Sequence, residues 1–192
     1  MTKLILASAS PRRAEILHNA GFAFTVLSSA VDETPFPDES AGDHVARLAA
    51  AKAELVAARA VGPAIVIAAD TVVALDNHIL GKPHSEGHAR QTLESLSGRT
   101  HTVLTGVTLI RLPDAERIEF VESTLVHFAQ LSEEEITRYL ATAEPHDKAG
   151  GYAIQGRAGR YIPRIEGCYF NVVGLPLARV QQALTDLGWT EP

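Results

Sequence analysis

The sequence predicts an α/β fold in which helices flank an elongated mixed sheet with a central cleft. Apolar strand-like runs alternate with helical segments through the first half of the chain, which is typical of α/β proteins. Two long strand-like segments, 99–112 and 118–130, are joined by a short turn and predict a hairpin, so the sheet is not purely parallel. The chain has neither a G-x-G-x-x-G after its first strand nor a P-loop sequence, which argues against dinucleotide-binding and P-loop folds.

Residue types indicate the boundaries of each expected element. Continuous apolar runs predict strands, and periodic segments with capping residues predict helices. Residues 150–175 alternate glycines with short apolar runs, which predicts short strands and tight turns. The expected strands are 4–7, 24–29, 64–75, 99–112 and 118–130, and the expected helices are 11 to about 21, 40 to about 60, 85–96, 132 to about 142, and about 176 to 187.

Serines are expected to mark several helix starts. Ser10 precedes Pro11, which suits the first helical position because an N–H there would have no partner. Ser40 and Ser132 each stand three residues before an acid, which is the spacing of a capping box. Between the helices, prolines and acids make 31–39 a loop, and Asp76-Asn77 is expected to form a turn.

Composition limits the class of protein. The chain has 192 residues, of which 46% are hydrophobic and 21% charged, as in soluble globular proteins. A net charge of −6 argues against a general nucleic-acid binder. The single cysteine, Cys168, allows neither an internal disulfide nor a cysteine-based zinc cluster, which fits a reducing cytoplasm. Since no segment has the length of a signal peptide core or a membrane span, we expect a cytoplasmic protein without a membrane partner.

Residues 8–13, Ser-Ala-Ser-Pro-Arg-Arg, predict an anion site at a helix start. The hydroxyls of Ser8 and Ser10, the free N–H groups of the first turn and the guanidiniums of Arg12 and Arg13 are expected to converge there. Two arginines indicate a polyanion such as a triphosphate. The alternative is a capped surface helix with solvated arginines.

Asp70 interrupts an otherwise apolar strand. A buried carboxylate without a partner is costly, so a metal, a cation or a substrate is expected to face it, and it could act as a metal ligand or a general base. Glu33 could join it as the second protein ligand of magnesium, with phosphate oxygens and water completing the shell. Asp32 and Glu39 compete for that role, and the alternative for Asp70 is a strand end that faces solvent.

Further motifs follow in a fixed order along the chain. They are Glu33, Ala69-Asp70-Thr71-Val72-Val73, Gly81-Lys82-Pro83, Ser97-Gly98-Arg99-Thr100-His101, Asp147-Lys148-Ala149-Gly150-Gly151-Tyr152 and Val173-Gly174-Leu175-Pro176. Together with residues 8–13, this ordered set resembles the Maf family of nucleotide pyrophosphatases over nearly the whole chain. The resemblance implies one Maf-like domain over 1–192, with two lobes around a cleft, a fold similar to inosine triphosphate pyrophosphatases, and a homodimer.

The resemblance also implies an activity and its residues. A nucleoside triphosphate would be hydrolysed to the monophosphate and pyrophosphate with a divalent metal cation, Mg²⁺ or Mn²⁺. Catalytic positions match Asp70, as proton acceptor, with Lys52 and Lys82, and the metal positions match Glu33 and Asp70. The phosphate-binding positions match Ser8, Arg12 and Arg13.

Substrate choice is linked by the resemblance to Arg12, Thr71 and Gln155. Gln155 resembles the branch that acts on dTTP and UTP, whereas the branch that acts on 7-methylguanosine triphosphate tends to have an acid there. Cys168 departs from the family pattern, which has serine at this position.

Other functions stay open at this point. They are a nucleotide-binding regulator of cell division and septum formation, a 7-methyl-GTP pyrophosphatase, and a phosphosugar or nucleotide-sugar binder. Intact Asp70, Glu33 and Lys82 favour an enzyme, because a pure binder does not need a buried general base.

Overall fold

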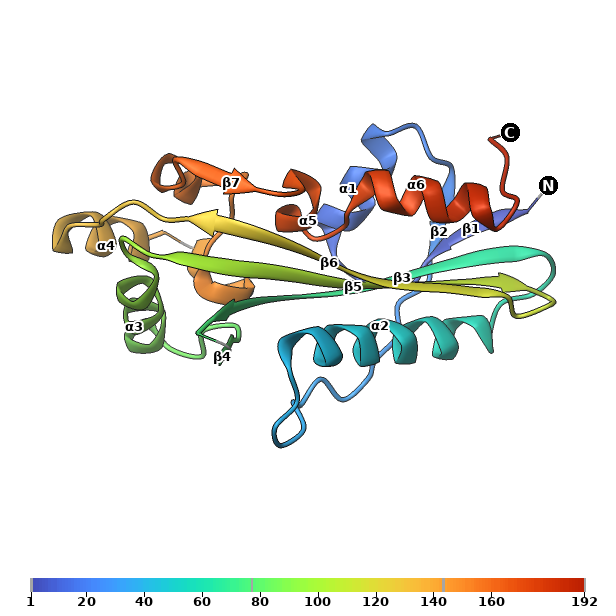
Figure 1. The fold of residues 1–192 in the computed structure, drawn as a ribbon, viewed down its shortest axis with the longest axis horizontal. Helices are drawn as coiled ribbons and strands as arrows, with labels where there is room; N and C mark the ends of the chain where they lie inside the picture. Colours follow the sequence, from blue (N-terminus) through green and yellow to red (C-terminus); the bar gives the residue numbers. More distant parts are fainter. Residues whose placement is uncertain (1, 77, 143, 192) are drawn as a thin grey trace. The chain divides into compact units, whose positions relative to one another are not determined.

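The computed structural model describes residues 2–76, 78–142 and 144–191, and within them it contains a seven-stranded mixed sheet. The strand order is β2-β1-β3-β5-β6-β7, and β4 pairs with β3 (Figure 1). β1 runs parallel to β2 and β3, whereas β4 is antiparallel to β3 and β7 is antiparallel to β6. The strands are β1 (Lys3–Leu6), β2 (Phe24–Val26), β3 (Ala64–Leu75), β4 (His78–Leu80), β5 (Thr100–Leu112), β6 (Arg117–His127) and β7 (Arg164–Glu166). The predicted mixed sheet is therefore confirmed.

The chain divides into two compact units, and the boundary between Asp70 and Thr71 lies inside β3. Unit 1 comprises Met1–Asp70, Thr105–Glu122 and Gly174–Pro192, and unit 2 comprises Thr71–Leu104 and Ser123–Val173. Strands β3, β5 and β6 contribute residues to both units. The arrangement of two lobes around a cleft stays a prediction.

Unit 1 buries its part of the sheet between helices. Figure 1 shows α2 (Ala41–Ala57) on one face, and α1 (Pro11–Asn19) and α6 (Leu177–Asp186) on the other. Ala53 and Val56 of α2 pack in one apolar cluster with strand residues such as Val66 and Ile110. The apolar stripe of α2 therefore fixes this helix against the sheet.

Unit 2 has its own core, beneath α3 (Glu86–Leu96) and α4 (Glu133–Leu140). Tyr152 and Tyr161 are buried in this core, whereas Tyr169 is 41% exposed. The remaining elements of this unit are η1 (Glu144–Asp147), η2 (Ala149–Gly151), η3 (Arg157–Tyr161) and α5 (Tyr169–Val173).

The prediction of short strands across 150–175 was largely wrong. Only β7 is extended among the described elements of this segment, and short 3₁₀ turns and α5 make up the rest. Gly150 and Gly151 have φ of 68° and 67°, which extended strands do not adopt. Alternation of glycines with apolar residues therefore reflects tight turns packed on a core.

The helix starts follow the serine pattern with two exceptions. Ser132 forms a full capping box, and Ser40 accepts a hydrogen bond from the Asp43 amide but donates its hydroxyl to the Asp43 carboxylate, at 2.7 Å. Ser10 is the N-cap residue of α1, but its side chain makes no capping hydrogen bond. Asp76 has a φ of 49°, which fits a turn, and Asn77 lies outside the described residues. Of the helices that the structure describes, none is both long and apolar enough to cross a membrane.

The burial of His101 predicts that unit 2 becomes less stable as the pH falls. The side chain is 2% exposed, and its Nε2 lies 2.7 Å from the Tyr152 hydroxyl. Burial, with a smaller effect of His127, lowers the pKa of His101 to about 4. Because the unfolded chain binds this proton near pH 6.5 and the folded chain does not, the stabilisation is complete above that pH and is lost as the pH falls through 4.

We expect the free energy of unfolding to decrease by up to about 3 kcal/mol between pH 6.5 and 4 because of this one group. Chemical denaturation of the wild type and of His101→Gln across this range measures the difference. An identical pH dependence in both proteins would contradict the assignment.

Candidate active site

The turn between β1 and α1 brings Ser8 and Arg13 together. Arg13 Nη1 donates to Ser8 Oγ at 3.0 Å, and Arg13 Nε donates to the Gly174 carbonyl at 2.8 Å. The Ser10 amide also donates to Ser8 Oγ, at 3.2 Å. Ser8 therefore belongs to the predicted cluster, whereas the expected contribution of the Ser10 hydroxyl as a cap is wrong. The backbone N–H of Ser10 uses the neighbouring serine instead.

The start of α1 concentrates positive charge. Burial lowers the pKa of Arg13, the carboxylates of Asp70 and Glu33 oppose that effect, and the adjacent Arg12 adds to it. The first turn of α1 contains no acidic residue. A helix N-terminus with two neighbouring guanidiniums is suited to a polyanion.

Lys52 joins the two predicted acids. Its Nζ donates to Asp70 Oδ1 at 2.7 Å and to Glu33 Oε1 at 2.6 Å. The side chains of Lys52 and Asp70 are 10% and 11% exposed, and that of Glu33 is 55% exposed. Asp70 thus faces a cation, as expected for a buried carboxylate, and the alternative of a solvent-facing strand end is wrong.

The burial of Lys52 has a signal in the sequence. Taken by itself, a lysine in a helix is expected on the surface. The buried face of α2 includes Val45, Leu48, Lys52 and Val56, which follow helical spacing. The period places Lys52 within this apolar stripe, so its ammonium group needs acidic partners.

A divalent cation fits the donor chemistry of this cluster. Glu33 and Asp70 offer carboxylate oxygens that already converge on one positive group. Asp32 instead accepts from the Thr34 amide, and Glu39 is bound by Arg47 and His44. Among the residues that the structure describes, no three or more His, Cys, Asp or Glu side chains form a candidate metal group. Glu33 and Asp70 are thus the two of these acids that could hold a metal, with phosphate and water completing its shell.

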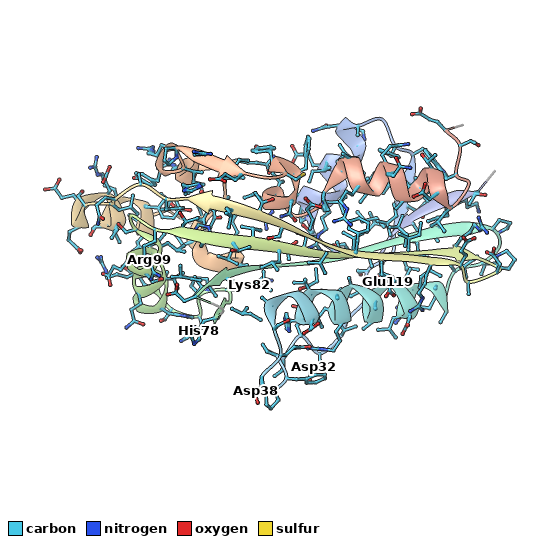
Figure 2. All side chains as sticks on the ribbon, in the orientation of Figure 1. Asp32, Asp38, His78, Lys82, Arg99 and Glu119 are labelled. Atoms are coloured by element: carbon cyan, nitrogen blue, oxygen red, sulfur yellow. The ribbon has the colours of Figure 1, made fainter. Side chains whose placement is uncertain are left out.

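Lys82, Thr71 and Gln155 belong to unit 2. Lys82 is exposed on the segment that follows β4 (Figure 2), Thr71 is half-buried in β3, and Gln155 is exposed. The Gly150 amide donates to the Gly81 carbonyl at 3.2 Å, so the segment that carries Lys82 is bound to the turn formed by Gly150 and Gly151. A Cβ atom on Gly150 would lie 2.9 Å from a methyl of Val73, which explains the glycine.

Glu144 holds the turn that carries Gln155. Its carboxylate accepts from the amide of Arg157 at 2.9 Å, the amide of Ala158 at 3.3 Å and the hydroxyl of Tyr139 at 2.9 Å. These contacts lower the pKa of Glu144 although burial opposes them. Sequence reasoning missed this acid, because the backbone groups it binds lie more than ten residues away.

The predicted site residues fall into two groups. Those of unit 1 are Ser8, Arg12, Arg13, Glu33, Lys52 and Asp70, and those of unit 2 are Thr71, Lys82 and Gln155. The union of both groups in one site stays a prediction.

Known proteins resemble this chain over nearly its whole length. A family model described as Maf-like protein matches residues 3–187. A protein of Syntrophus aciditrophicus named dTTP/UTP pyrophosphatase is 48% identical, over 97% of this chain and 90% of its own. A protein of the same name from Symbiobacterium thermophilum is 50% identical, over 98% of this chain and 96% of its own. A solved structure of a HAM1 protein from Coxiella burnetii has a TM-score of 0.47 and 16% identity, covering 68% of this chain and 75% of its own.

Proposed function

This chain belongs to the Maf family, and from that premise we propose that it hydrolyses nucleoside triphosphates, dTTP and UTP in particular, to the monophosphate and pyrophosphate. The names of relatives at 48% and 50% identity support this substrate class. The observation that carries the proposal is the contact of the buried Lys52 ammonium group with Asp70 and Glu33, in the same unit as the arginine-rich start of α1.

The start of α1 would bind the triphosphate chain. Arg12, Arg13 and the N–H groups of the first turn neutralise the β- and γ-phosphates, and Ser8 holds Arg13 in place. Neutralising these oxygens makes pyrophosphate a better leaving group. The same contacts also bind the ground state, so Arg13 contributes to affinity as well as to turnover.

Asp70 would orient water and accept its proton. Lys52 fixes one carboxylate oxygen, Oδ1, by its hydrogen bond of 2.7 Å, which leaves Oδ2 as the acceptor in this proposal. Lys82 would add positive charge from unit 2. When Mg²⁺ or Mn²⁺ is held by Glu33 and Asp70, it supplies Lewis-acid neutralisation of the phosphate oxygens.

We also propose a homodimer, which the resemblance to the Maf family implies, and a cytoplasmic location, which the single cysteine, Cys168, fits. The net charge of −6 agrees with the absence of a general nucleic-acid-binding role.

The bond that is cleaved tests the proposed function. Incubation of UTP or dTTP with the protein and Mg²⁺ in ¹⁸O-labelled water is expected to give labelled monophosphate and unlabelled pyrophosphate, because water attacks the α-phosphorus. Chromatography and mass spectrometry separate the products. Nucleoside diphosphate and orthophosphate would contradict the proposal, and nucleotide binding without turnover would favour a regulator.

Gln155 is expected to select the base. Uracil and thymine present an acceptor at O4 beside a donor at N3–H, and a glutamine amide matches both groups. Glutamate offers only acceptors, so Gln155→Glu leaves a mismatch at O4 that costs about 1–3 kcal/mol. The catalytic efficiency for UTP should fall about ten- to a hundredfold. The ratio of efficiencies for UTP and 7-methyl-GTP in both proteins measures this, and an unchanged ratio would mean that Gln155 does not read the base.

A further inference from the structure

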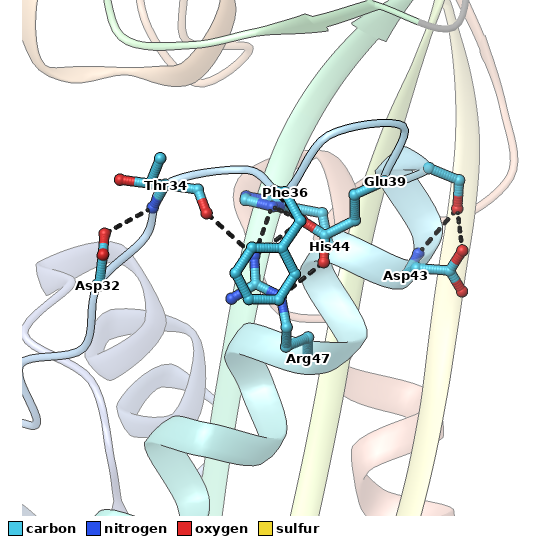
Figure 3. A network of polar contacts seen from close by, with 8 residues as sticks. Asp32, Thr34, Phe36, Glu39, Asp43, His44 and Arg47 are labelled. Carbon is cyan, nitrogen blue, oxygen red and sulfur yellow. Dashed lines mark hydrogen bonds and ion pairs between the residues drawn. The ribbon is translucent and has the colours of Figure 1, made fainter.

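The loop 31–39 carries Glu33. The end of this loop is fixed to α2 by a polar cluster of Glu39 with His44 and Arg47 (Figure 3). The Glu39 side chain is 7% exposed and accepts from Arg47 Nε at 2.6 Å and Arg47 Nη2 at 2.8 Å. His44 Nδ1 lies 2.9 Å from Glu39 Oε2, and the Phe36 amide donates to the same oxygen at 3.1 Å. A buried carboxylate therefore receives donors from both the helix and the loop.

Arg47 contacts the loop at three places. Besides Glu39, its Nη2 donates to the Thr34 carbonyl at 3.2 Å, next to Glu33. Its guanidinium carbon lies 4.0 Å from the centre of the Phe36 ring. Phe36 is 58% exposed, so cation–π contact rather than burial holds this ring.

We call the contacts of Glu39, His44 and Arg47 with the loop 31–39 the clamp. The loop has the backbone geometry that this clamp requires. The Glu39 amide donates to the Phe36 carbonyl at 3.2 Å, which closes a turn with Pro37 and Asp38 at its centre. Asp38 has a φ of 59°, as the third residue of a type II turn needs, and it lies at the outer tip of the loop (Figure 2). The turn reverses the chain and returns Glu39 to α2.

We propose that Glu39, His44 and Arg47 are positioning residues that hold the loop 31–39 so that Glu33 meets Lys52. The proposal rests on the proposed function of Glu33 and Lys52. Both Arg47 and Lys52 project from α2, so one helix holds the loop at its end and at Glu33. Without the clamp, a half-exposed glutamate on an irregular loop samples many conformations, and only a few of them reach Lys52.

The Glu39 carboxylate is ionised at neutral pH. Hydrogen bonds from Arg47, followed by those from His44 and the Phe36 amide, hold the pKa of Glu39 well below its usual value, although desolvation opposes them. Lysine at position 47 would keep the charge, but it lacks the planar fork that reaches Glu39 and Thr34 together.

Hydrogen–deuterium exchange tests the clamp without nucleotide or metal. In Arg47→Ala, peptides that cover residues 31–40 are expected to exchange about tenfold faster or more, with Arg47→Lys between it and the wild type. Arg117→Ala is the matched control, because Arg117 pairs with Glu54 of the same helix at 2.9 Å, away from the loop. Unchanged exchange in Arg47→Ala and Arg47→Lys would overturn the proposal.

A double-mutant cycle tests the link to Glu33. Arg47→Ala is expected to lower kcat for UTP about ten- to a hundredfold with a smaller change in KM, and Arg117→Ala to keep the wild-type kcat. If Arg47 acts through Glu33, then Glu33→Gln combined with Arg47→Ala is no slower than Glu33→Gln alone. If the double variant instead shows the product of the two single decreases in kcat, the link between Arg47 and Glu33 is overturned. A wild type that hydrolyses no triphosphate refutes the proposed function, and the exchange experiment then decides the clamp.

Discussion

Replacement of Asp70 by asparagine is expected to lower the turnover of UTP by about two to four powers of ten while nucleotide binding persists. Asparagine keeps the size of the side chain, and its carbonyl oxygen can still accept from Lys52, which donates to Asp70 at 2.7 Å in the wild type. The amide cannot take a proton from water. The substitution therefore removes the proposed base with little change in packing.

Pyrophosphate release measures turnover, and calorimetric titration with UTP measures binding. Asp76→Asn is the control, since Asp76 follows the same strand and pairs with Arg99 on an exposed surface. Its turnover should stay near that of the wild type. Near-normal turnover in Asp70→Asn would exclude Asp70 as the base.

Elements with local signals were predictable from the sequence. The strand 64–75 was confirmed with the predicted bounds, because a long apolar run is delimited by Gly62-Pro63 and by the turn at Asp76. Ser132 and Glu135 predicted the start of α4 correctly, because both partners of the capping box lie within one helical turn. Such signals need no knowledge of the rest of the fold.

Features that depend on distant contacts were not predictable in the same way. The hydroxyl of Ser8, rather than that of Ser10, organises the start of α1, because Arg13 and the Ser10 amide both use it. The partnership of Lys52 with Glu33 and Asp70 joins a helix, a loop and a strand. Residue types identified the members of this cluster, but only the fold shows that one ammonium group binds both acids.

Gly106 carries a packing constraint that no local pattern indicates. It lies within β5, where Thr105-Gly106-Val107 is expected only as part of a strand. A Cβ atom there would lie 2.7 Å from the amide nitrogen of Ala46, and it would overlap the carbonyl group of Val45. Both belong to the backbone of α2, so rotation of a side chain cannot relieve the contact. Glycine is needed here because the helix backbone rests directly on the strand.

Gly106→Ala is therefore expected to destabilise the protein by about 3 kcal/mol or more, since α2 must move away from the sheet. For a chain of this size, the melting temperature should fall by about 6–12 °C. Gly42→Ala in α2 is the matched control, because its Cβ would meet only Ser40 Oγ, at 3.8 Å, and alanine favours helices. That variant should be as stable as the wild type or more so.

The displacement of α2 should also reach the active site. Lys52 and Arg47 both project from this helix, so their contacts with Glu33 and with the loop 31–39 depend on where it rests. We expect Gly106→Ala to lose turnover of UTP even at temperatures where it remains folded, and Gly42→Ala to retain it. Calorimetry gives the melting temperatures, and pyrophosphate release below both of them gives turnover. A Gly106→Ala protein with wild-type stability would mean that α2 does not rest on Gly106. A Gly106→Ala protein that is less stable but keeps the wild-type turnover would mean that Lys52 tolerates the shift of α2.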